Sequence, residues 1–354
     1  MSFRAFGAPH RYIQGPGSLS ELKGLVALYG RRPFIVADAV VADLLGTRLR
    51  AELDGAEPAV FGVFGGECTA AEIAALAGAA RAAQADVIIG VGGGKAIDTA
   101  KGVRMALNLP IIIVPTIASN DSPTSRLAVL YREDHVLSEV RLMTASPDVV
   151  LVDTAIIIQA PARFFIAGIG DALSKKFEVE QCAGAGGTNF FKGRPTQLAL
   201  GIANACYDII RREGEAAVAA VRRHEATEAV ENTVEAAILM SGLAFESGGL
   251  SIAHSLTRGF SAIPEIARAL HGEQVALGLL VQVVAERRTP RFLDDLRGLY
   301  DRIGLPTSLA AFGVSDPDAV DTIVRLSWET APYIKNFTQP LSPEILRAAF
   351  LSLG

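Results

Sequence analysis

The first half of the chain alternates short apolar runs with alanine-rich stretches, and this alternation restricts the possible folds more than any other feature. Strands are expected at 31–38, 58–66, 85–92 and 109–116, and helices at 69–84 and 96–108. Such alternation is typical of a parallel sheet with helices on both faces. The sequence therefore predicts an α/β architecture for this half.

Two details refine this half of the chain. Thr69 followed by Glu72 predicts a capping box at the start of the helix over 69–84. The segment 122–152 breaks the alternation, and we expect a β-excursion there that ends in a strand over 148–153.

The second half has a different pattern, because strand signals nearly vanish after about residue 160. Helical periodicity covers 196–221, 231–247 and 271–287. With 354 residues the chain is also too long for a typical single core. We therefore expect a Rossmann-like α/β domain over 1–160 and an all-helical domain over 161–354, with a cleft between them.

Composition excludes several classes of protein. A net charge of -5 argues against nucleic-acid binding, and the apolar runs are too short to span a bilayer. The N-terminal residues lack the apolar core of a signal peptide. The cysteines are odd in number and lack a metal-binding spacing: Cys68, Cys182 and Cys206. We expect a cytoplasmic protein with reduced thiols.

Three glycines follow a predicted strand and open a helix: Gly92, Gly93 and Gly94. Glycines let the backbone approach a ligand closely, and the free N–H groups of a helix start attract an anion such as phosphate. Lys95 would add a positive charge. The spacing fits neither a Walker A loop nor the strict Rossmann fingerprint, so an ordinary glycine-rich turn is the alternative.

Two further segments fit a nucleotide site. Asp38 ends a predicted strand, where its carboxylate would accept hydrogen bonds from ribose hydroxyls and would favour NAD over NADP. Its alternative role is a turn residue or helix cap. The loop over 115–131 is rich in small polar residues and would wrap a cofactor or simply form a turn. Within it, Asp121 is also compatible with an Asx-turn.

Asp171, His254 and His271 form a candidate metal site, although they lie in three separate segments of a chain with only five histidines. Two imidazoles and one carboxylate suit zinc or ferrous iron, and three ligands leave a position open for a substrate oxygen. Spacing alone does not establish the site. Taken singly, Asp171 is compatible with a helix cap, His254 with a core histidine and His271 with a helix start.

With these motifs the chain resembles the glycerol dehydrogenase branch of the iron-containing (group III) alcohol dehydrogenases. The resemblance covers nearly the whole chain, and the matching stretches are RYIQGPG, FGGEC, GVGGGKAIDTAK, PTIASNDSPTS, APARFFIAGIGDAL, GLAFESGGLSIAH and HGEQVALG. It implies the dehydroquinate synthase-like fold of that family, with NAD between the two domains and a metal ion beside the nicotinamide.

The resemblance also assigns residues. Asp171, His254 and His271 match the family's zinc ligands, and Asp121 matches its substrate-contacting aspartate. The NAD contacts are matched by Asp38 at the ribose, by Gly94, Lys95, Ala96, Ile97 and Asp98 in the pyrophosphate loop, and by Thr116, Ile117, Ala118, Ser119, Ser125, Leu127 and Tyr131.

The activity that the resemblance implies is the reversible, NAD- and metal-dependent oxidation of a small polyol or vicinal diol, such as glycerol, to the hydroxyketone. Zinc is the expected metal, with iron, manganese and nickel as alternatives. The metal would lower the pKa of the alcohol, and Asp121 would hold a neighbouring hydroxyl. The family commonly forms dimers and octamers, so we expect a homo-oligomer.

Three cations depart from the branch. Other iron-containing dehydrogenases place a fourth ligand, a histidine, where Lys175 stands; the glycerol dehydrogenase branch lacks it too. Arg258 and Arg126 replace uncharged residues, and histidines often found at the positions of Thr257 and Arg268 are missing.

These cations suggest an alternative substrate, a 2-hydroxy acid, its 2-oxo partner or a phosphorylated polyol. Alternatively they face solvent, contact NAD phosphates, or pair with Asp171, Glu178 or Glu246. A lyase of the dehydroquinate synthase type and a non-catalytic NAD-binding protein are further alternatives.

Overall fold

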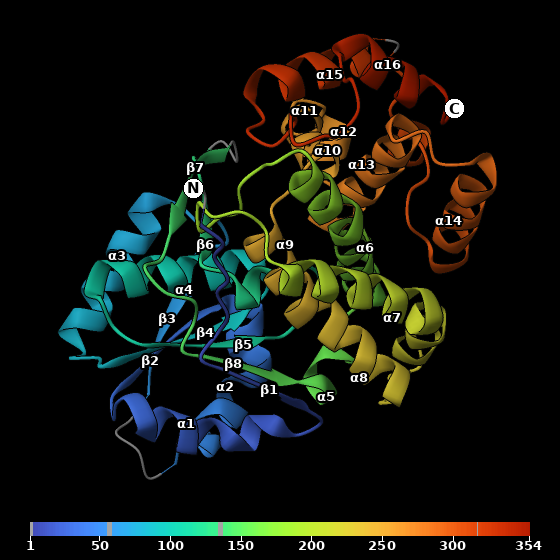
Figure 1. Ribbon diagram of the computed structural model, residues 1–354. Coiled ribbons are helices and arrows are strands. Elements are labelled where there is room, and N and C mark those ends of the chain that lie inside the picture. The colour runs from blue at the N-terminus through green and yellow to red at the C-terminus, as the bar shows by residue number, and fades with distance from the viewer. Residues whose placement is uncertain (1–2, 55–58, 134–136, 317) are drawn as a thin grey trace.

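The computed structural model describes residues 3–54, 59–133, 137–316 and 318–354. Its first half is built on one sheet of six parallel strands in the order β1-β8-β5-β4-β2-β3 (Figure 1). The strands are β1 (Arg11–Gly15), β2 (Pro33–Asp38), β3 (Val60–Phe64), β4 (Val87–Gly92), β5 (Ile111–Pro115) and β8 (Val149–Asp153). The predicted parallel sheet is thus confirmed, with β1 as an added edge strand.

Both faces of the sheet are covered, as the continuous apolar strands require. The helices α1 (Leu22–Tyr29) and α2 (Ala39–Glu52) cover one face, where Ile35 packs in a core with Leu22 and Leu49. The helices α3 (Ala70–Ala82) and α4 (Gly94–Leu107) cover the other, where Phe34 packs in a core with Leu76 (Figure 1). Successive residues of one strand therefore point into different cores.

The capping box predicted at α3 is only half formed. The Thr69 hydroxyl accepts from the backbone N–H of Glu72 at 3.1 Å, as predicted. The Glu72 carboxylate, however, accepts from the backbone N–H of Gly65 at 2.8 Å, while the Thr69 N–H donates to the Glu67 carbonyl. The prediction was wrong for Glu72 because the loop from β3 offers this carboxylate a closer donor.

The segment that breaks the alternation contains two antiparallel strands, in agreement with the expected β-excursion. After a short 3-10 turn, η2 (Ser122–Thr124), β6 (Leu127–Tyr131) pairs antiparallel with β7 (Leu137–Leu142) in a separate two-stranded sheet. Strand β8 then returns the chain to the main sheet beside β5 and β1. A 3-10 turn, η1 (Ser18–Glu21), and a short helix, α5 (Thr154–Ile157), complete this half.

From Ala162 onward the described residues contain helices and no strand. The helices are α6 (Ala162–Gly184), α7 (Gln197–Val221), α8 (Glu228–Glu235), α9 (Ser241–Gly248), α10 (Ile252–Ser255), α11 (Thr257–Phe260), α12 (Pro264–Ala267), α13 (His271–Ala285), α14 (Pro290–Ile303), α15 (Ala319–Thr330) and α16 (Pro343–Leu351), with a π-helical turn η3 (Ala236–Met240) and a 3-10 turn η4 (Leu309–Phe312). The predicted all-helical second half is confirmed. None of these helices alone is long and apolar enough to cross a membrane; only the pair Glu228–Gly248 and Ile252–Phe260, bent by 92°, meets that test jointly.

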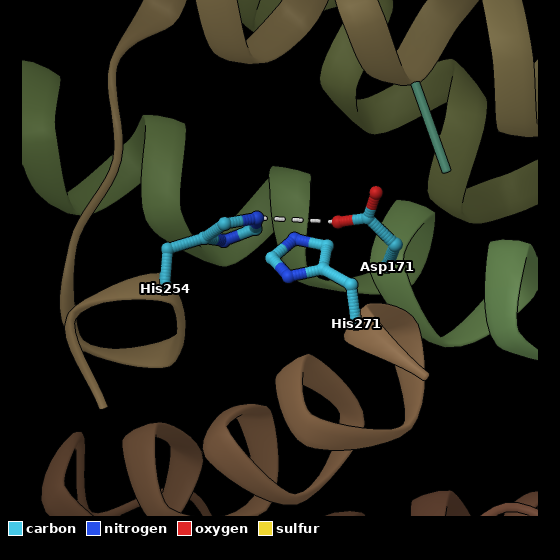
Figure 2. Close-up of side chains that lie close together, drawn as sticks. All are labelled: Asp171, His254 and His271. Carbon is cyan, nitrogen blue, oxygen red and sulfur yellow. Dashed lines mark ion pairs between the residues drawn. The ribbon is translucent and has the colours of Figure 1, made fainter. Parts of the chain in front are cut away.

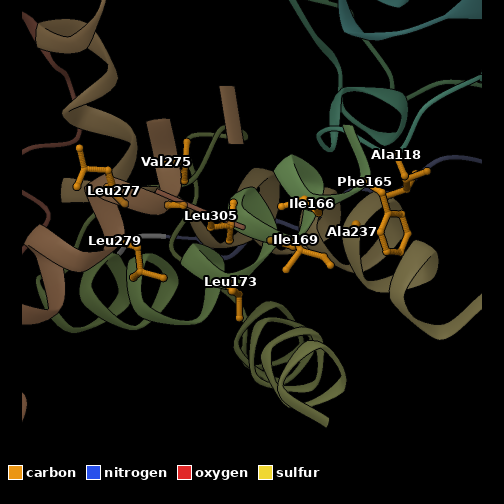
Figure 3. Close-up of a cluster of buried hydrophobic side chains, with 14 of the residues drawn as sticks. Ala118, Phe165, Ile166, Ile169, Leu173, Ala237, Val275, Leu277, Leu279 and Leu305 are labelled. Atoms are coloured by element: carbon orange, nitrogen blue, oxygen red, sulfur yellow. The ribbon is translucent and has the colours of Figure 1, made fainter. Parts of the chain in front are cut away.

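The helices α6 and α13 cross in direct backbone contact, which brings two of the candidate metal ligands together. A Cβ atom on Gly272 would lie only 1.7 Å from the carbonyl oxygen of Ala167. Beside this crossing, α6 and α13 bury apolar side chains such as Ile169 and Leu277 (Figure 3). The missing side chain at Gly272 therefore sets the distance between Asp171 on α6 and His271 on α13.

Replacing Gly272 by alanine should destabilise the protein, because a methyl group would be forced against a backbone carbonyl of α6. We expect the free energy of unfolding to fall by about 1–3 kcal/mol or more. The matched control is Gly201→Ala in α7, where a Cβ would meet nothing within 4 Å; this change should stabilise by about 0.4–1 kcal/mol. Urea denaturation with a chelator present measures both, and equal stabilities would contradict the close crossing.

Candidate functional site

Asp171, His254 and His271 point toward one another from three different helices (Figure 2). One ligand atom from each lies within 4.8 Å of the other two, and His254 Nε2 is 3.2 Å from Asp171 Oδ1. Asp171 lies in the middle of α6 and is fully buried, so its alternative role as a helix cap is wrong. His271 is the first residue of α13, so the helix start that was its alternative role is confirmed. Its ring nevertheless faces the side chains of Asp171 and His254 (Figure 2).

Glu178 fixes the orientation of the His254 ring. Its Oε2 lies 2.5 Å from His254 Nδ1, and its Oε1 accepts from the backbone N–H groups of Ser251 and His254, each at 2.9 Å. With Nδ1 engaged, Nε2 is the nitrogen presented to Asp171. A carboxylate on the second ring nitrogen is the usual support of a metal-binding histidine. Sequence reasoning missed this role, although Glu178 stands seven residues after Asp171 on the same helical face.

Lys175 lies inside the same cluster and is fully buried. Its Nζ atom is 2.5 Å from Asp171 Oδ1, 3.1 Å from Asp121 Oδ2 and 3.1 Å from His254 Nε2. The predicted common face of Asp171 and Lys175 on α6 is confirmed, and so is the ion pair with Asp171 that was one alternative for this lysine. Asp121 also accepts a hydrogen bond from the Ser241 hydroxyl at 2.7 Å, which fixes its carboxylate in the cluster.

Two features of the cluster suit a divalent metal ion: an excess of negative charge and a carboxylate oxygen without a hydrogen-bond partner in the part of the chain that the structure describes. Asp121, Asp171 and Glu178 are all buried, and with neutral imidazoles Lys175 is their single positive partner within the cluster among the described residues. Buried charges require partners, so two further positive charges complete the cluster. In addition, Asp171 Oδ2 is buried without a hydrogen-bond partner in the described part of the chain. Carboxylate and imidazole are suitable ligands for such an ion.

The cluster shifts the pKa values of the two imidazoles in opposite directions. Burial lowers the pKa of His254, but the Glu178 carboxylate and the Asp171 hydrogen bond outweigh burial and raise that pKa to about 9. Desolvation of the His271 ring, aided by the positive charges of His254 and Lys175, lowers its pKa, although the residue as a whole is solvent-exposed. Burial also raises the pKa of Asp121, aided by the negative charge of Asp171.

The two arginines highlighted by the sequence have different surroundings. Arg126 donates from Nε to Glu246 Oε1 at 2.8 Å and stacks over the Phe191 ring at 3.7 Å. Its alternative reading, an ion pair with Glu246, is thus confirmed, and a direct contact with substrate is not supported. Arg258 in α11 is half-buried, and within the described ranges its guanidinium makes no hydrogen bond or ion pair.

Two candidate nucleotide-binding residues, Asp38 and Gly92, lie where the order in which the chain adds strands to the sheet reverses. The chain passes from β2 to β3 toward one edge of the sheet, and from β4 to β5 toward the other edge. The neighbouring strands β2 and β4, which end at Asp38 and Gly92, therefore flank this switch point. Ligands of open α/β sheets bind at such points. One oxygen of Asp38 accepts from the Val41 N–H at 2.8 Å, so the helix-cap alternative is correct for it. The other lies 3.6 Å from where a Gly92 Cβ would be.

The loops after β4 and β5 are in contact. A Cβ on Gly93 would lie 2.7 Å from Ile117 Cδ1, and one on Gly94 would lie 2.9 Å from Asn120 Nδ2. Of the remaining expected NAD contacts, Thr116, Ala118 and Ser119 are buried in this loop. Side chains of the loop after β5 therefore approach both glycines closely.

Some charged residues of the expected pyrophosphate loop have partners within the protein. The Lys95 side chain pairs with Glu67 at 2.8 Å and lies over the Tyr131 ring, so its charge is already balanced. Asp98 accepts from the Ser122 hydroxyl at 2.7 Å and from the Val129 N–H at 3.1 Å. The side chain of Asp98 therefore holds the loop that follows β5 and is turned away from the surface.

Lys101 completes this support and was not identified from the sequence. It is fully buried, lies 3.3 Å from Asp98, and donates to the carbonyl oxygens of Ser122 at 2.7 Å and Leu127 at 2.6 Å. Ser125, one of the expected NAD contacts, is buried with its hydroxyl 3.4 Å from the Lys101 Nζ atom. The signal for Lys101 was its spacing of three residues from Asp98 in a predicted helix.

Comparisons with known proteins agree with this arrangement. The family model described as iron-containing alcohol dehydrogenase matches residues 9–154. The chain is 36% identical to a glycerol dehydrogenase of Escherichia coli O6:H1 over 98% of this chain and 96% of the relative, and 36% identical to a glycolaldehyde reductase of Halobacterium salinarum over the same shares. The structure of a probable glycerol dehydrogenase from Sinorhizobium meliloti 1021 is similar, with a TM-score of 0.93, 37% identity, and 99% and 98% of the two chains covered. The similarity thus extends over the sheet and the helices.

The raised pKa of His254 predicts how the stability of the ion-free protein depends on pH. A histidine whose pKa rises from 6.5 to about 9 on folding contributes stability that is complete below pH 6.5 and is lost as pH rises through 9. Melting temperatures in a chelator should therefore fall between pH 6.5 and 9. His254→Gln, which removes the titrating group, should melt with little change over this range. Parallel pH profiles for the two proteins would contradict the assignment.

Proposed function

Because the chain belongs to the iron-containing alcohol dehydrogenase family, in its glycerol dehydrogenase branch, we propose that it oxidises glycerol or a similar small vicinal diol to the hydroxyketone, reversibly and with NAD. The observation that carries this proposal is the cluster in which the buried Asp171, the half-buried His254 and the exposed His271 converge beside Asp121. Such a cluster suits the binding of a hydroxyl group at a divalent ion and the recognition of a second hydroxyl next to it.

Asp171, His254 and His271 would hold the divalent ion, and His254 would bind through Nε2 because Glu178 occupies Nδ1. The bound ion supplies a positive charge that lowers the pKa of a hydroxyl group at neutral pH. One carboxylate and two imidazoles favour zinc, with iron, manganese and nickel as alternatives. The unpartnered Asp171 Oδ2 supports this assignment.

Asp121 would select substrates that carry a second hydroxyl group. Its carboxylate is held by Ser241 at 2.7 Å and by Lys175 at 3.1 Å, so it is fixed near the ligand residues. A carboxylate accepts a hydrogen bond from an alcohol, and a site built for that bond discriminates against a substrate that lacks the hydroxyl. The names of the two relatives, glycerol dehydrogenase and glycolaldehyde reductase, both refer to substrates with neighbouring oxygens.

For NAD we propose a site along the switch point of the sheet. Asp38 would accept from the ribose hydroxyls, and the backbone of Gly92, Gly93 and Gly94 at the start of α4 would face the pyrophosphate. The other proposed contacts are Lys95, Ala96, Ile97, Asp98, Thr116, Ile117, Ala118, Ser119, Ser125, Leu127 and Tyr131. Held there, NAD would supply the acceptor for the hydride of the alcohol carbon.

The family resemblance supports three further proposals, which concern the domains, the compartment and the assembly of the protein. We propose that residues 1–160 form the coenzyme domain and that residues 161–354 form the metal and substrate domain. We also propose that the protein is cytoplasmic and assembles as a dimer or an octamer. Gel filtration with light scattering distinguishes these two assemblies from a monomer.

The alternative of a hydroxy-acid or phosphorylated substrate is not favoured. Two of the three cations behind it are paired internally, Lys175 with Asp171 and Asp121, and Arg126 with Glu246. Of the three, Arg258 alone keeps a proposed contact with the substrate. The lyase and non-catalytic alternatives are not favoured either, because near-full-length relatives are named as a dehydrogenase and a reductase.

A substrate screen tests the proposed reaction. With NAD and added zinc, glycerol and 1,2-propanediol should be oxidised with a kcat/KM at least about tenfold above that of 1-propanol or 2-hydroxy acids. The reason is that the Asp121 carboxylate would accept a hydrogen bond from the second hydroxyl group of a diol. Activity should disappear on chelation and return with zinc. Asp121→Asn should reduce the preference for diols over 1-propanol. Efficient turnover of hydroxy acids and none of diols would overturn the proposal.

A substitution of Asp38 tests the proposed coenzyme site without loosening α2. Asp38→Ser keeps a side chain that caps a helix well, so the melting temperature should change little. The loss of the carboxylate should lower kcat/KM for NAD by about tenfold and raise it for NADP, since a carboxylate repels the 2′-phosphate. An unchanged ratio between the two coenzymes would remove Asp38 from the site.

A further inference from the structure

The position of Lys175 within the proposed metal cluster is not explained by the reaction. Its amino group is in hydrogen-bonding range of two proposed ligand atoms, at 2.5 Å from Asp171 Oδ1 and 3.1 Å from His254 Nε2. The side chain is fully buried, so solvent does not screen its charge. The cluster therefore contains a cation of its own before any metal ion binds.

The amino group and a metal ion would be close neighbours. Zinc binds imidazole nitrogen at about 2.0–2.1 Å. An ion on His254 Nε2 would consequently lie no more than about 5 Å from the Lys175 Nζ atom as it stands, in a buried cluster where repulsion between like charges is strong. An ion that binds Asp171 and His254 therefore competes with the Lys175 ammonium group for the same two side chains.

Asp121 offers the amino group a second partner. Its Oδ2 atom is already 3.1 Å away and is held in place by the Ser241 hydroxyl. The charges balance in such a rearranged cluster. Lys175 neutralises Asp121, and a divalent ion neutralises Asp171 and Glu178, so three buried carboxylates meet three positive charges. The lysine and the ion can thus occupy the cluster together, with the lysine displaced.

From this geometry we propose that Lys175 is an internal competitor of the divalent ion. It stabilises the ion-free protein by neutralising Asp171, weakens the affinity of the site for a divalent ion, and turns onto Asp121 when the ion binds. This inference rests on the proposed metal site and adds a residue that sets its affinity. The next residue, Lys176, provides a comparison, because it pairs with Glu180 and Asn204 outside the cluster.

The test compares the zinc affinity of the full chain and its variants by competition with a chromophoric chelator. Lys175→Met, neutral and similar in length, should bind Zn²⁺ at least tenfold more tightly than the wild type. Its ion-free form should melt at a lower temperature, so the increase in melting temperature caused by Zn²⁺ should be larger. Lys175→Gln provides a second neutral variant if the methionine variant does not fold. Lys175→Arg, which keeps the charge, should show no gain in affinity, and Lys176→Met should match the wild type.

The outcomes separate the two proposals. Zinc binding by the wild type and by the neutral Lys175 variants with equal dissociation constants would overturn the role of Lys175 and leave the metal site intact. A tenfold gain in Lys176→Met as well would also overturn it, since the effect would then be a general one of charge. If neither the wild type nor any variant binds Zn²⁺ at this cluster, the proposed metal site itself is wrong.

Discussion

The structure depends above all on the need of three buried carboxylates for positive partners. Asp121, Asp171 and Glu178 share one cluster, and a charge that is removed from water without a partner is strongly destabilising. One face of α6 supplies much of the arrangement, because Asp171, Lys175 and Glu178 follow one another at helical spacing. The crossing of α6 and α13 at Gly272 adds His271, and the short helix α10 adds His254. The fold thus gathers an excess of buried negative charge that a divalent ion would neutralise.

The same contacts connect this cluster to the sheet. The loop after β5 lies against Gly93 and Gly94 on one side and continues to Asp121 on the other. It also touches α6 directly, since a Cβ on Gly168 would lie 2.0 Å from the Ala118 carbonyl oxygen. Because backbone packs on backbone at Gly168 and side chains of the same loop meet Gly93 and Gly94, the proposed coenzyme loop and the proposed metal cluster share one support. Such a support suits a reaction in which hydride passes between two bound groups.

The sequence predicted the parts of the fold that depend on local pattern. Apolar β-rich runs between alanine-rich helices identified β2, β3, β4 and β5, and helical periodicity identified α7 and α13. The glycine run was identified because it follows a strand and opens a helix. Partnerships between distant segments were beyond such patterns. The pairing of Arg126 with Glu246 was one of several alternatives, and that of Lys95 with Glu67 was not foreseen. Glu72 turned to Gly65 because a neighbouring loop competed with the local cap. The three candidate ligands were grouped by residue type and family resemblance, since no spacing rule joins residues from three helices.

We propose above all that one divalent ion is held jointly by Asp171, His254 and His271. X-ray absorption at the zinc edge of the zinc-loaded protein tests it most directly, because imidazole rings give a characteristic outer-shell scattering. We expect two imidazole nitrogens and carboxylate oxygen at about 2.0–2.2 Å from the zinc, and we expect the scattering of one imidazole to be lost in His271→Ala. A spectrum without imidazole scattering, or one unchanged by His271→Ala, would contradict it.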